Sequence, residues 1–265
     1  MNFKNLFPNN KPLIACIHLL ALPGSPGYCG NISTVINQAL KEAEIFNNHK
    51  VDGLIIENFG DIPFYKDQVP SETIASMTMI THEIKKVFKG PVGVNVLRND
   101  AKAALAIAVA TQAQFIRVNV HIGAAVTDQG IIEGKAFETL RLRRALDSDV
   151  LIFADVAVKH ASPMGSRSIE DETKDLSERG LADVLIVSGH HTGGEADLKE
   201  INRIKQNTHL PVIIGSGITL DNLNNYFSLA DGFIVGSYFK TEGKAQNEVE
   251  ETRVSSFMDK FKLNN

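Results

Sequence analysis

Short runs of apolar residues recur along the chain, and most show no alternation of polar and apolar positions. Eight runs rich in β-branched residues occupy residues 12–18, 53–58, 91–97, 115–120, 150–158, 183–189, 211–217 and 231–237. A strand with this continuous pattern is buried on both faces, as in a parallel sheet that helices cover. The pattern therefore predicts eight buried parallel strands.

Helical spacing of apolar residues separates these runs. Segments 35–46, 101–108 and 254–261 each place apolar residues three or four positions apart, which gives a helix one apolar face. Asp100 directly precedes the second segment and is expected to cap its helix. Strands and helices therefore alternate along the whole chain.

Eight strand–helix units in one chain of this length favour an α/β fold of the TIM (β/α)₈ barrel type. We expect residues 1–265 to form one barrel domain, with a short N-terminal extension over residues 1–10. A doubly wound Rossmann sheet is the alternative. It would normally carry G-x-G-x-x-G after the first strand, where this chain has "HLLALPGSPG", and no G-x-x-x-x-G-K-[ST] motif is present either.

Composition and charge narrow the class of protein. The 265 residues are 43% hydrophobic, and the net charge is 27 − 31 = −4 without a basic block, so we expect no nucleic-acid polymer as partner. The two cysteines indicate no disulfide framework, and Cys16 is interpreted as a small core residue. No signal-peptide pattern and no apolar run of membrane-spanning length occur, so a cytoplasmic protein without a membrane span is expected.

The polar residues that close the apolar runs are the candidate catalytic groups, because active sites of such barrels lie at the C-terminal ends of the strands. Nearly every run ends in polar residues, and this convergence is a stronger signal than any one of them. The candidates are His18, Glu57, Asn95, Arg117, Asn119, Asp155 and Lys159.

These candidates could act as acids, bases or ligand contacts. A carboxylate at a barrel mouth is partly desolvated, which can raise the pKa of Glu57 or Asp155 toward a useful range. The alternative for Asp155 is a structural ion pair with Arg117 or Lys159. A buried Lys159 could form a Schiff base. His18 is interpreted as a group for ligand contact or proton transfer, with a satisfied core histidine as the alternative.

The last three units carry a glycine-rich pattern at their strand ends, namely "SGHHTGGEAD", "GSGIT" and "GSYFK". The loops after strands seven and eight of such barrels commonly bind phosphate, because glycines let backbone N–H groups approach the anion. The alternative is that the glycines only form tight turns. The predicted phosphate-binding residues are Ser188, Gly189, Thr192, Gly193, Gly215, Ser216, Gly217, Gly236, Ser237 and Lys240.

A metal site receives little support from the sequence. A metal-dependent barrel hydrolase would usually have His-x-His on its first strand, and only His18 is there. Adjacent residues of a strand point to opposite faces, so His190 and His191 could not both be ligands from a strand. We therefore expect neither a metal nor another cofactor.

Several segments in combination resemble the BtpA/SgcQ family. They are "HLLALPGSPGY", "PVGVNVLRNDAKAALAIA", "FIRVNV", "FADVAVKHA", "SGHHTGGEAD" and "ADGFIVGSYFK", and the resemblance runs from about Lys11 to Met258. It implies a fold similar to phosphate-binding TIM barrels. Cyanobacterial members are associated with photosystem I biogenesis, and others with sugar or nucleoside metabolism. The resemblance transfers no catalytic roles to residues of this chain.

Three functions remain open at this point. The first is an enzyme acting on a small phosphorylated metabolite, such as a sugar phosphate or nucleotide, by general acid–base chemistry. The second is an assembly or biogenesis factor, as the photosystem association of relatives implies. The third is a metal-dependent hydrolase, which the histidine pattern disfavours. By analogy with other barrels of this kind, we expect a homo-oligomer.

Overall fold

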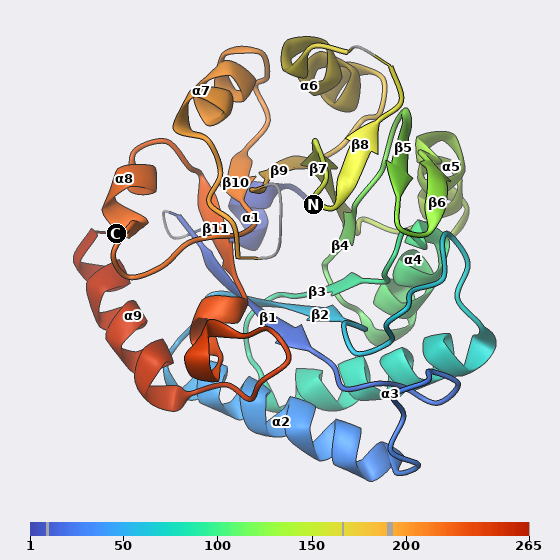
Figure 1. Cartoon of the computed structure of the whole chain (residues 1–265), viewed down its shortest axis with the longest axis vertical. Coiled ribbons are helices and arrows are strands. Elements are labelled where there is room, and N and C mark those ends of the chain that lie inside the picture. The colour runs from blue at the N-terminus through green and yellow to red at the C-terminus, as the bar shows by residue number, and fades with distance from the viewer. Residues whose placement is uncertain (9–10, 166, 190–192, 265) are drawn as a thin grey trace.

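A computed structural model describes residues 1–8, 11–165, 167–189 and 193–264. It confirms the (β/α)₈ barrel: eight parallel strands close in the order β1-β11-β10-β9-β7-β4-β3-β2, with helices around them (Figure 1). The barrel strands are β1 (Leu13–His18), β2 (Gly53–Glu57), β3 (Val92–Asn95), β4 (Phe115–Val118), β7 (Leu151–Val156), β9 (Val184–Val187), β10 (Val212–Ile214) and β11 (Gly232–Val235).

Amphipathic helices cover the outside of the barrel, and the outward-facing strand residues pack against them in one apolar cluster. Asp100 caps the helix that follows β3, since its side chain accepts a hydrogen bond from the Ala103 N–H. The helices are α1 (Phe3–Leu6), α2 (Ile32–Asn48), α3 (Ser71–Val87), α4 (Ala101–Thr111), α5 (Ala136–Ala145), α6 (Ile169–Glu178), α7 (Leu198–Gln206), α8 (Leu223–Phe227) and α9 (Glu251–Asn264).

The lower half of the barrel interior is a second apolar cluster. Inward-facing side chains of the strands fill it, and the rings of Phe115 and Phe153 stack there with centroids 4.5 Å apart. Gly93 makes room for this pair, because a Cβ at residue 93 would lie 2.1 Å from the Phe115 ring. The interior below the mouth is therefore packed with side chains.

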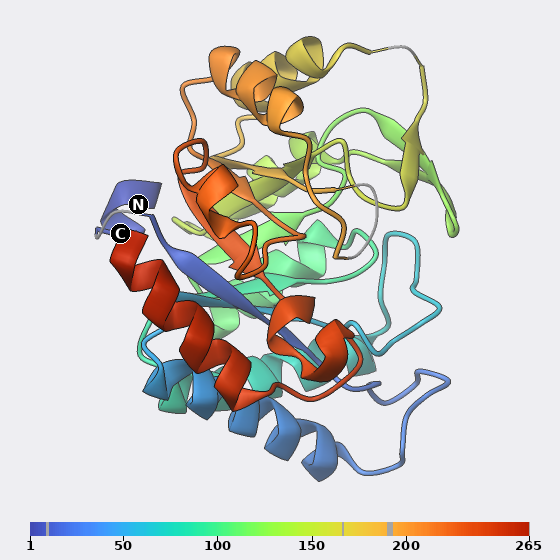
Figure 2. The same cartoon turned by 60° about the vertical axis from the view of Figure 1, so that its left-hand side comes forward.

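The expected N-terminal extension closes the bottom of the barrel. Helix α1 brings Phe3 and Phe7 into the same interior cluster, where their rings lie 6.1 Å from Phe153 and 6.4 Å from Phe115 respectively. Figure 2 shows α1 at the end of the barrel opposite the long loops. Apolar side chains thus fill this end of the interior, and the hollows described below lie at the other end.

A small antiparallel sheet, which the hydrophobic pattern did not predict, lies at the mouth end. Strands β5 (Ala124–Thr127), β6 (Gly130–Glu133) and β8 (Ala161–Pro163) pair in the order β6-β5-β8. They come from the segments that follow β4 and β7, so they extend the wall of the mouth (Figure 2).

The last units differ from the expected strand–helix repeat. Strand β11 is followed by two short 3₁₀ turns, η1 (Ser237–Phe239) and η2 (Thr241–Gly243), and α8 begins six residues after Gly217. The N-terminus of an α-helix therefore does not directly follow either glycine loop. None of the described helices is both long enough and apolar enough to cross a bilayer.

Candidate functional site

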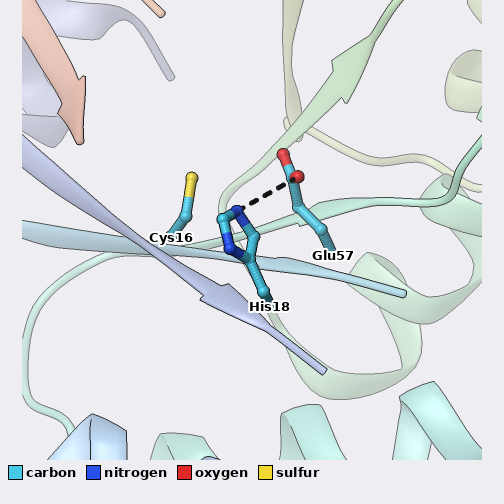
Figure 3. Close-up of side chains that lie close together, drawn as sticks. All are labelled: Cys16, His18 and Glu57. Carbon is cyan, nitrogen blue, oxygen red and sulfur yellow. Dashed lines mark ion pairs between the residues drawn. The ribbon is translucent and has the colours of Figure 1, made fainter. Parts of the chain in front are cut away.

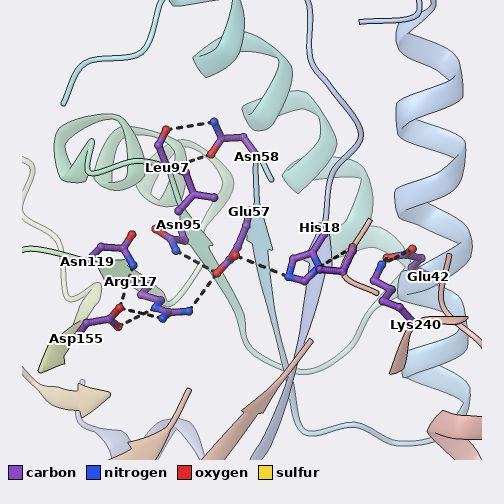
Figure 4. A network of polar contacts seen from close by, with 11 residues as sticks. His18, Glu42, Glu57, Asn58, Asn95, Leu97, Arg117, Asn119, Asp155 and Lys240 are labelled. Carbon is purple, nitrogen blue, oxygen red and sulfur yellow. Dashed lines mark hydrogen bonds and ion pairs between the residues drawn. The ribbon is translucent and has the colours of Figure 1, made fainter. Parts of the chain in front are cut away.

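The alternation of side chains along a strand decides which residues face the mouth. Residues two apart on a strand share a face, so inward-facing apolar residues such as Ile55, Phe115 and Phe153 are followed by inward-facing polar ones. These polar residues are Glu57, Arg117 and Asp155, all of which are buried. The same step places Asn95 on β3 and Asn119 just after β4 beside them, as Figure 4 shows.

Arg117 is at the centre of this network. Its Nε and Nη2 atoms each lie 2.9 Å from one carboxylate oxygen of Asp155, and its Nη1 lies 3.3 Å from Glu57 Oε1. Burial opposes a charge here, but Asp155 and Glu57 more than offset it and raise the pKa of Arg117 above its usual range. The guanidinium therefore stays charged although the residue is only 4% exposed.

Two asparagines complete the network. Asn95 Nδ2 donates to Glu57 Oε1 at 3.1 Å, and Asn119 Nδ2 donates to Asp155 Oδ2 at 3.0 Å. Burial would raise the pKa of Glu57, but the Arg117 charge and the Asn95 hydrogen bond help to lower it, so this carboxyl is ionised at neutral pH. Asn119 Oδ1 is buried without a hydrogen-bond partner among the described residues, which leaves an acceptor for a ligand.

His18 faces the second oxygen of Glu57. Its Nε2 lies 3.9 Å from Glu57 Oε2, while its Nδ1 lies 3.1 Å from the Ala245 carbonyl oxygen. Because a carbonyl only accepts, Nδ1 carries the proton and Nε2 keeps its lone pair. Burial lowers the pKa of His18 to about 4, so the ring is neutral at neutral pH and its contact with Glu57 is not an ion pair. Phe59 stacks on the ring at 4.5 Å.

Lys159 is the one half-buried lysine beside the network in the described part of the chain. Burial, and then the Arg117 charge, lower the pKa of Lys159 to about 8. The network of Arg117, Glu57 and Asp155 sums to +1 − 2 = −1, so a protonated Lys159 balances its charge. Such an amine can exchange a proton near neutral pH. Arg98 holds the Lys159 backbone in place, since its guanidinium donates to the Lys159 carbonyl.

Two adjoining hollows form the mouth. The larger has a volume of about 340 Å³ and the smaller about 60 Å³. Both are lined by Glu57, Phe59, Arg117 and Lys159, so they meet at the charged network. A hollow of about 520 Å³ also lies outside the barrel wall, against α3, α4 and α5, but none of the predicted catalytic residues lines it.

The glycine-rich strand ends line the smaller hollow. Of the predicted phosphate-binding residues, Gly193, Gly215, Ser216, Gly217, Gly236 and Ser237 are on its wall. Among the described residues, the backbone N–H groups of Gly217, Gly236 and Ser237 have no hydrogen-bond acceptor. Unpaired N–H groups around a small hollow can bind an anion.

Three other predicted phosphate-binding residues have different surroundings. Lys240 is buried with its Nζ 2.6 and 2.7 Å from the two carboxylate oxygens of Glu42, so its charge is used in a structural ion pair. The Gly189 N–H donates to the Ser216 hydroxyl, which in turn donates to the Gly194 carbonyl. Ser188 does not line the hollow, although its hydroxyl is buried without a partner among the described residues. Thr192 lies outside the described residues.

Several lining residues were not predicted. Phe59, Ile62 and Phe64 line the larger hollow, and Cys16 lines the smaller one. Arg98 also lines the larger hollow, and its signal was its place directly after the apolar run 91–97. Cys16 had a detectable signal: it stands two residues before His18, so both side chains face the same side of β1. The loop residues had none, because the periodicity of strands and helices does not extend to them.

These features define the chain as a (β/α)₈ barrel with a charged, ligand-sized mouth at the C-terminal ends of its strands. Residues 9–263 match the model of the BtpA family, and the chain belongs to that family.

Relatives are similar over nearly their whole length. An uncharacterized protein of Methanocaldococcus jannaschii is 46% identical, with 94% of each chain covered. The photosystem I biogenesis protein BtpA of Synechocystis is 44% identical, over 98% of this chain and 91% of the relative.

Solved structures support the fold. The N-(5'-phosphoribosyl)anthranilate isomerase of Pyrococcus furiosus superposes with a TM-score of 0.58 at 15% identity, over 96% of this chain and 99% of that one. A tryptophan synthase structure from M. tuberculosis gives 0.60 at 13% identity, over 97% and 93%. At these identities the likeness concerns the fold alone.

Replacing Arg117 tests the buried network. We expect Arg117→Met to lower the free energy of unfolding by about 3–5 kcal/mol, because it removes the guanidinium that is paired with two buried carboxylates. Arg203→Met is the matched control, since Arg203 makes an equally bidentate contact with Glu170 at the surface and should change stability little. Urea unfolding followed by circular dichroism measures both. Equal losses in the two variants would contradict a buried, interdependent network.

The ionisation of Lys159 can be measured by competitive acetylation at a series of pH values, with peptide mass spectrometry as the readout. Because only the neutral amine reacts, labelling of Lys159 should rise with a midpoint near pH 8. The lowered pKa also means that the folded protein binds fewer protons than the unfolded chain between about pH 8 and the ordinary lysine range, so this group makes stability rise with pH there. A labelling midpoint at or above that of exposed Lys102 would contradict the assignment.

Proposed function

We propose that this protein is an enzyme that acts on a small phosphorylated metabolite by proton transfer at the barrel mouth. One observation carries the proposal: the smaller hollow is lined by N–H groups that have no acceptor among the described residues, and it meets the larger hollow at Glu57, Arg117 and Lys159. A phosphate in the smaller hollow would place the rest of its molecule over these charged groups. Such anchoring accelerates a reaction by fixing the reacting atoms beside the catalytic ones.

The phosphate would be bound mainly by backbone N–H groups of Gly217, Gly236 and Ser237. Lys240 takes no part, because its ammonium is paired with Glu42. The name of one structural neighbour, a phosphoribosylanthranilate isomerase, refers to a phosphorylated substrate. That likeness supports the proposal only as an analogy of fold.

The reacting part of the ligand would lie against Lys159, which is the group we assign to proton transfer. Its position on the wall of both hollows and its lowered pKa suit a general acid or base near neutral pH. Glu57 presents the Oε2 atom, which accepts no hydrogen bond from Arg117 or Asn95. Asn119 presents to the same mouth an Oδ1 that has no hydrogen-bond partner in the described part of the chain. Isomerisation, lyase and hydrolytic reactions all require such groups.

A second candidate function is an assembly role, and the name of the Synechocystis relative favours it. That role requires a partner-binding surface and gives no reason for a buried charged network that opens into a hollow. A variant that blocks the hollow and leaves the exterior unchanged separates the two functions. It should lose ligand binding, whereas an assembly role at the exterior surface would be retained.

Phosphate binding predicts a rise in melting temperature. Ribose 5-phosphate at a hundredfold excess over its Kd should stabilise the wild type by about 2.7 kcal/mol. Gly236→Ala should abolish this shift, because its Cβ would enter the hollow 3.0 Å from the His18 ring while the charge stays the same. Differential scanning fluorimetry with and without the ligand measures the effect.

The choice of glycine matters for this test. Gly217 has a φ of +74°, and a Cβ there would lie 2.2 Å from the Gly194 carbonyl oxygen, so a variant at Gly217 would disturb the backbone. Gly27→Ala is the control, since Gly27 lines neither hollow and its new Cβ would meet a side-chain atom about as closely as the one at Gly236, with the Ala21 Cβ at 3.3 Å. If neither ribose 5-phosphate nor inorganic phosphate shifts the wild-type melting curve, the glycines only form turns and the proposed substrate class is wrong.

A further inference from the structure

We propose that Cys16, His18 and Glu57 form a binding site for a divalent transition metal of the Zn²⁺ type, next to the phosphate hollow. Each residue offers one ligand atom, and these atoms all lie within 4.8 Å of one another (Figure 3). The inference goes beyond the proposed function, which requires no metal.

The barrel framework positions the three ligands. Cys16 and His18 stand two residues apart on β1 and therefore point into the interior from the same face. Glu57 is the direct neighbour of His18 in the parallel pairing of β1 with β2. All three are thus held by rigid strands, and the backbone need not move for them to converge.

The surroundings of His18 and Glu57 suit metal ligation. The Nδ1–H of His18 donates a hydrogen bond to the Ala245 carbonyl oxygen. The Nε2 atom accepts no hydrogen bond from any described residue. Metal-ligating histidines usually donate their other ring N–H to such a group, which fixes the ring. Arg117 and Asn95 both contact Glu57 Oε1, so Oε2 is the oxygen that faces His18.

The spacing is close to that of an occupied site. Ligand atoms of a tetrahedral Zn²⁺ site are roughly 3.3–3.6 Å apart, as follows from metal–ligand bonds of about 2.0–2.3 Å. Here His18 Nε2 and Glu57 Oε2 are 3.9 Å apart, and the whole set lies within 4.8 Å. A contraction of roughly 1 Å by side-chain rotation would complete the ligand set.

The donor types select the metal. A thiolate and an imidazole suit Zn²⁺ and its neighbours among the transition metals, whereas Ca²⁺ and Mg²⁺ prefer oxygen ligands. Three protein ligands leave a fourth position open, which is the pattern of catalytic rather than structural zinc sites. All three residues line the smaller hollow beside Gly236 and Ser237, so that position would face the bound ligand.

Cobalt binding tests the site directly. After treatment with a chelator, the wild-type protein should bind one Co²⁺ per chain and show a thiolate-to-cobalt charge-transfer band in the near ultraviolet. Cys16→Ser should lose the band and bind Co²⁺ at least tenfold more weakly. The exposed cysteine supplies the matched control, and Cys29→Ser should retain both band and affinity. Isothermal titration calorimetry with Zn²⁺ measures the same stoichiometry in the wild type and the same loss of affinity in the variants.

A second variant and a check of folding show whether a loss of metal binding is due to misfolding. His18→Gln should also weaken Co²⁺ binding at least tenfold, and far-ultraviolet circular dichroism shows whether each variant keeps the native fold. The proposal is overturned if the chelated wild type binds no stoichiometric Co²⁺, or if a folded Cys16→Ser variant retains the band. The ribose 5-phosphate melting shift, measured on chelator-treated protein, tests the proposed function separately, because the phosphate hollow needs no metal.

Discussion

The buried guanidinium of Arg117 is the constraint on which the mouth of this barrel depends. A charge removed from water costs several kcal/mol unless it is paired and hydrogen-bonded. Arg117 on β4 therefore requires Asp155 from β7 and Glu57 from β2, and these in turn are held by Asn119 and Asn95. The network fixes Glu57 so that only one of its oxygens faces His18, and its surplus negative charge accommodates Lys159.

The rest of the barrel isolates this network from water on one side and opens it on the other. Phenylalanines of the strands and of α1 close the bottom, so the charged layer is bounded below by apolar side chains. Above it, the glycine-rich strand ends and the loop carrying Lys159 form the adjoining hollows. The charged network and the hollows that a ligand can enter therefore both lie at the C-terminal ends of the strands, where active sites lie in other barrels of this class.

The sequence predicted the barrel because continuous apolar runs and helical spacing depend only on local pattern. The candidate catalytic residues were found because the fold rule places active sites at strand ends. The ion-pair partner of a charged residue could not be predicted from the sequence. Lys240 pairs with Glu42, which is 198 residues away along the chain, because the packing of α2 brings the two together. The β5–β6 hairpin was missed because its strands are short and its turn, Asp128-Gln129, lacks glycine at its two central positions.

A crystal structure of the protein with ribose 5-phosphate tests the central claim most directly. We expect the phosphate within hydrogen-bond distance of the Gly236 and Ser237 N–H groups, with the sugar extending past Glu57 toward Lys159. A phosphate bound instead at the exposed arginines of α5, with only water beside Gly236, would contradict it.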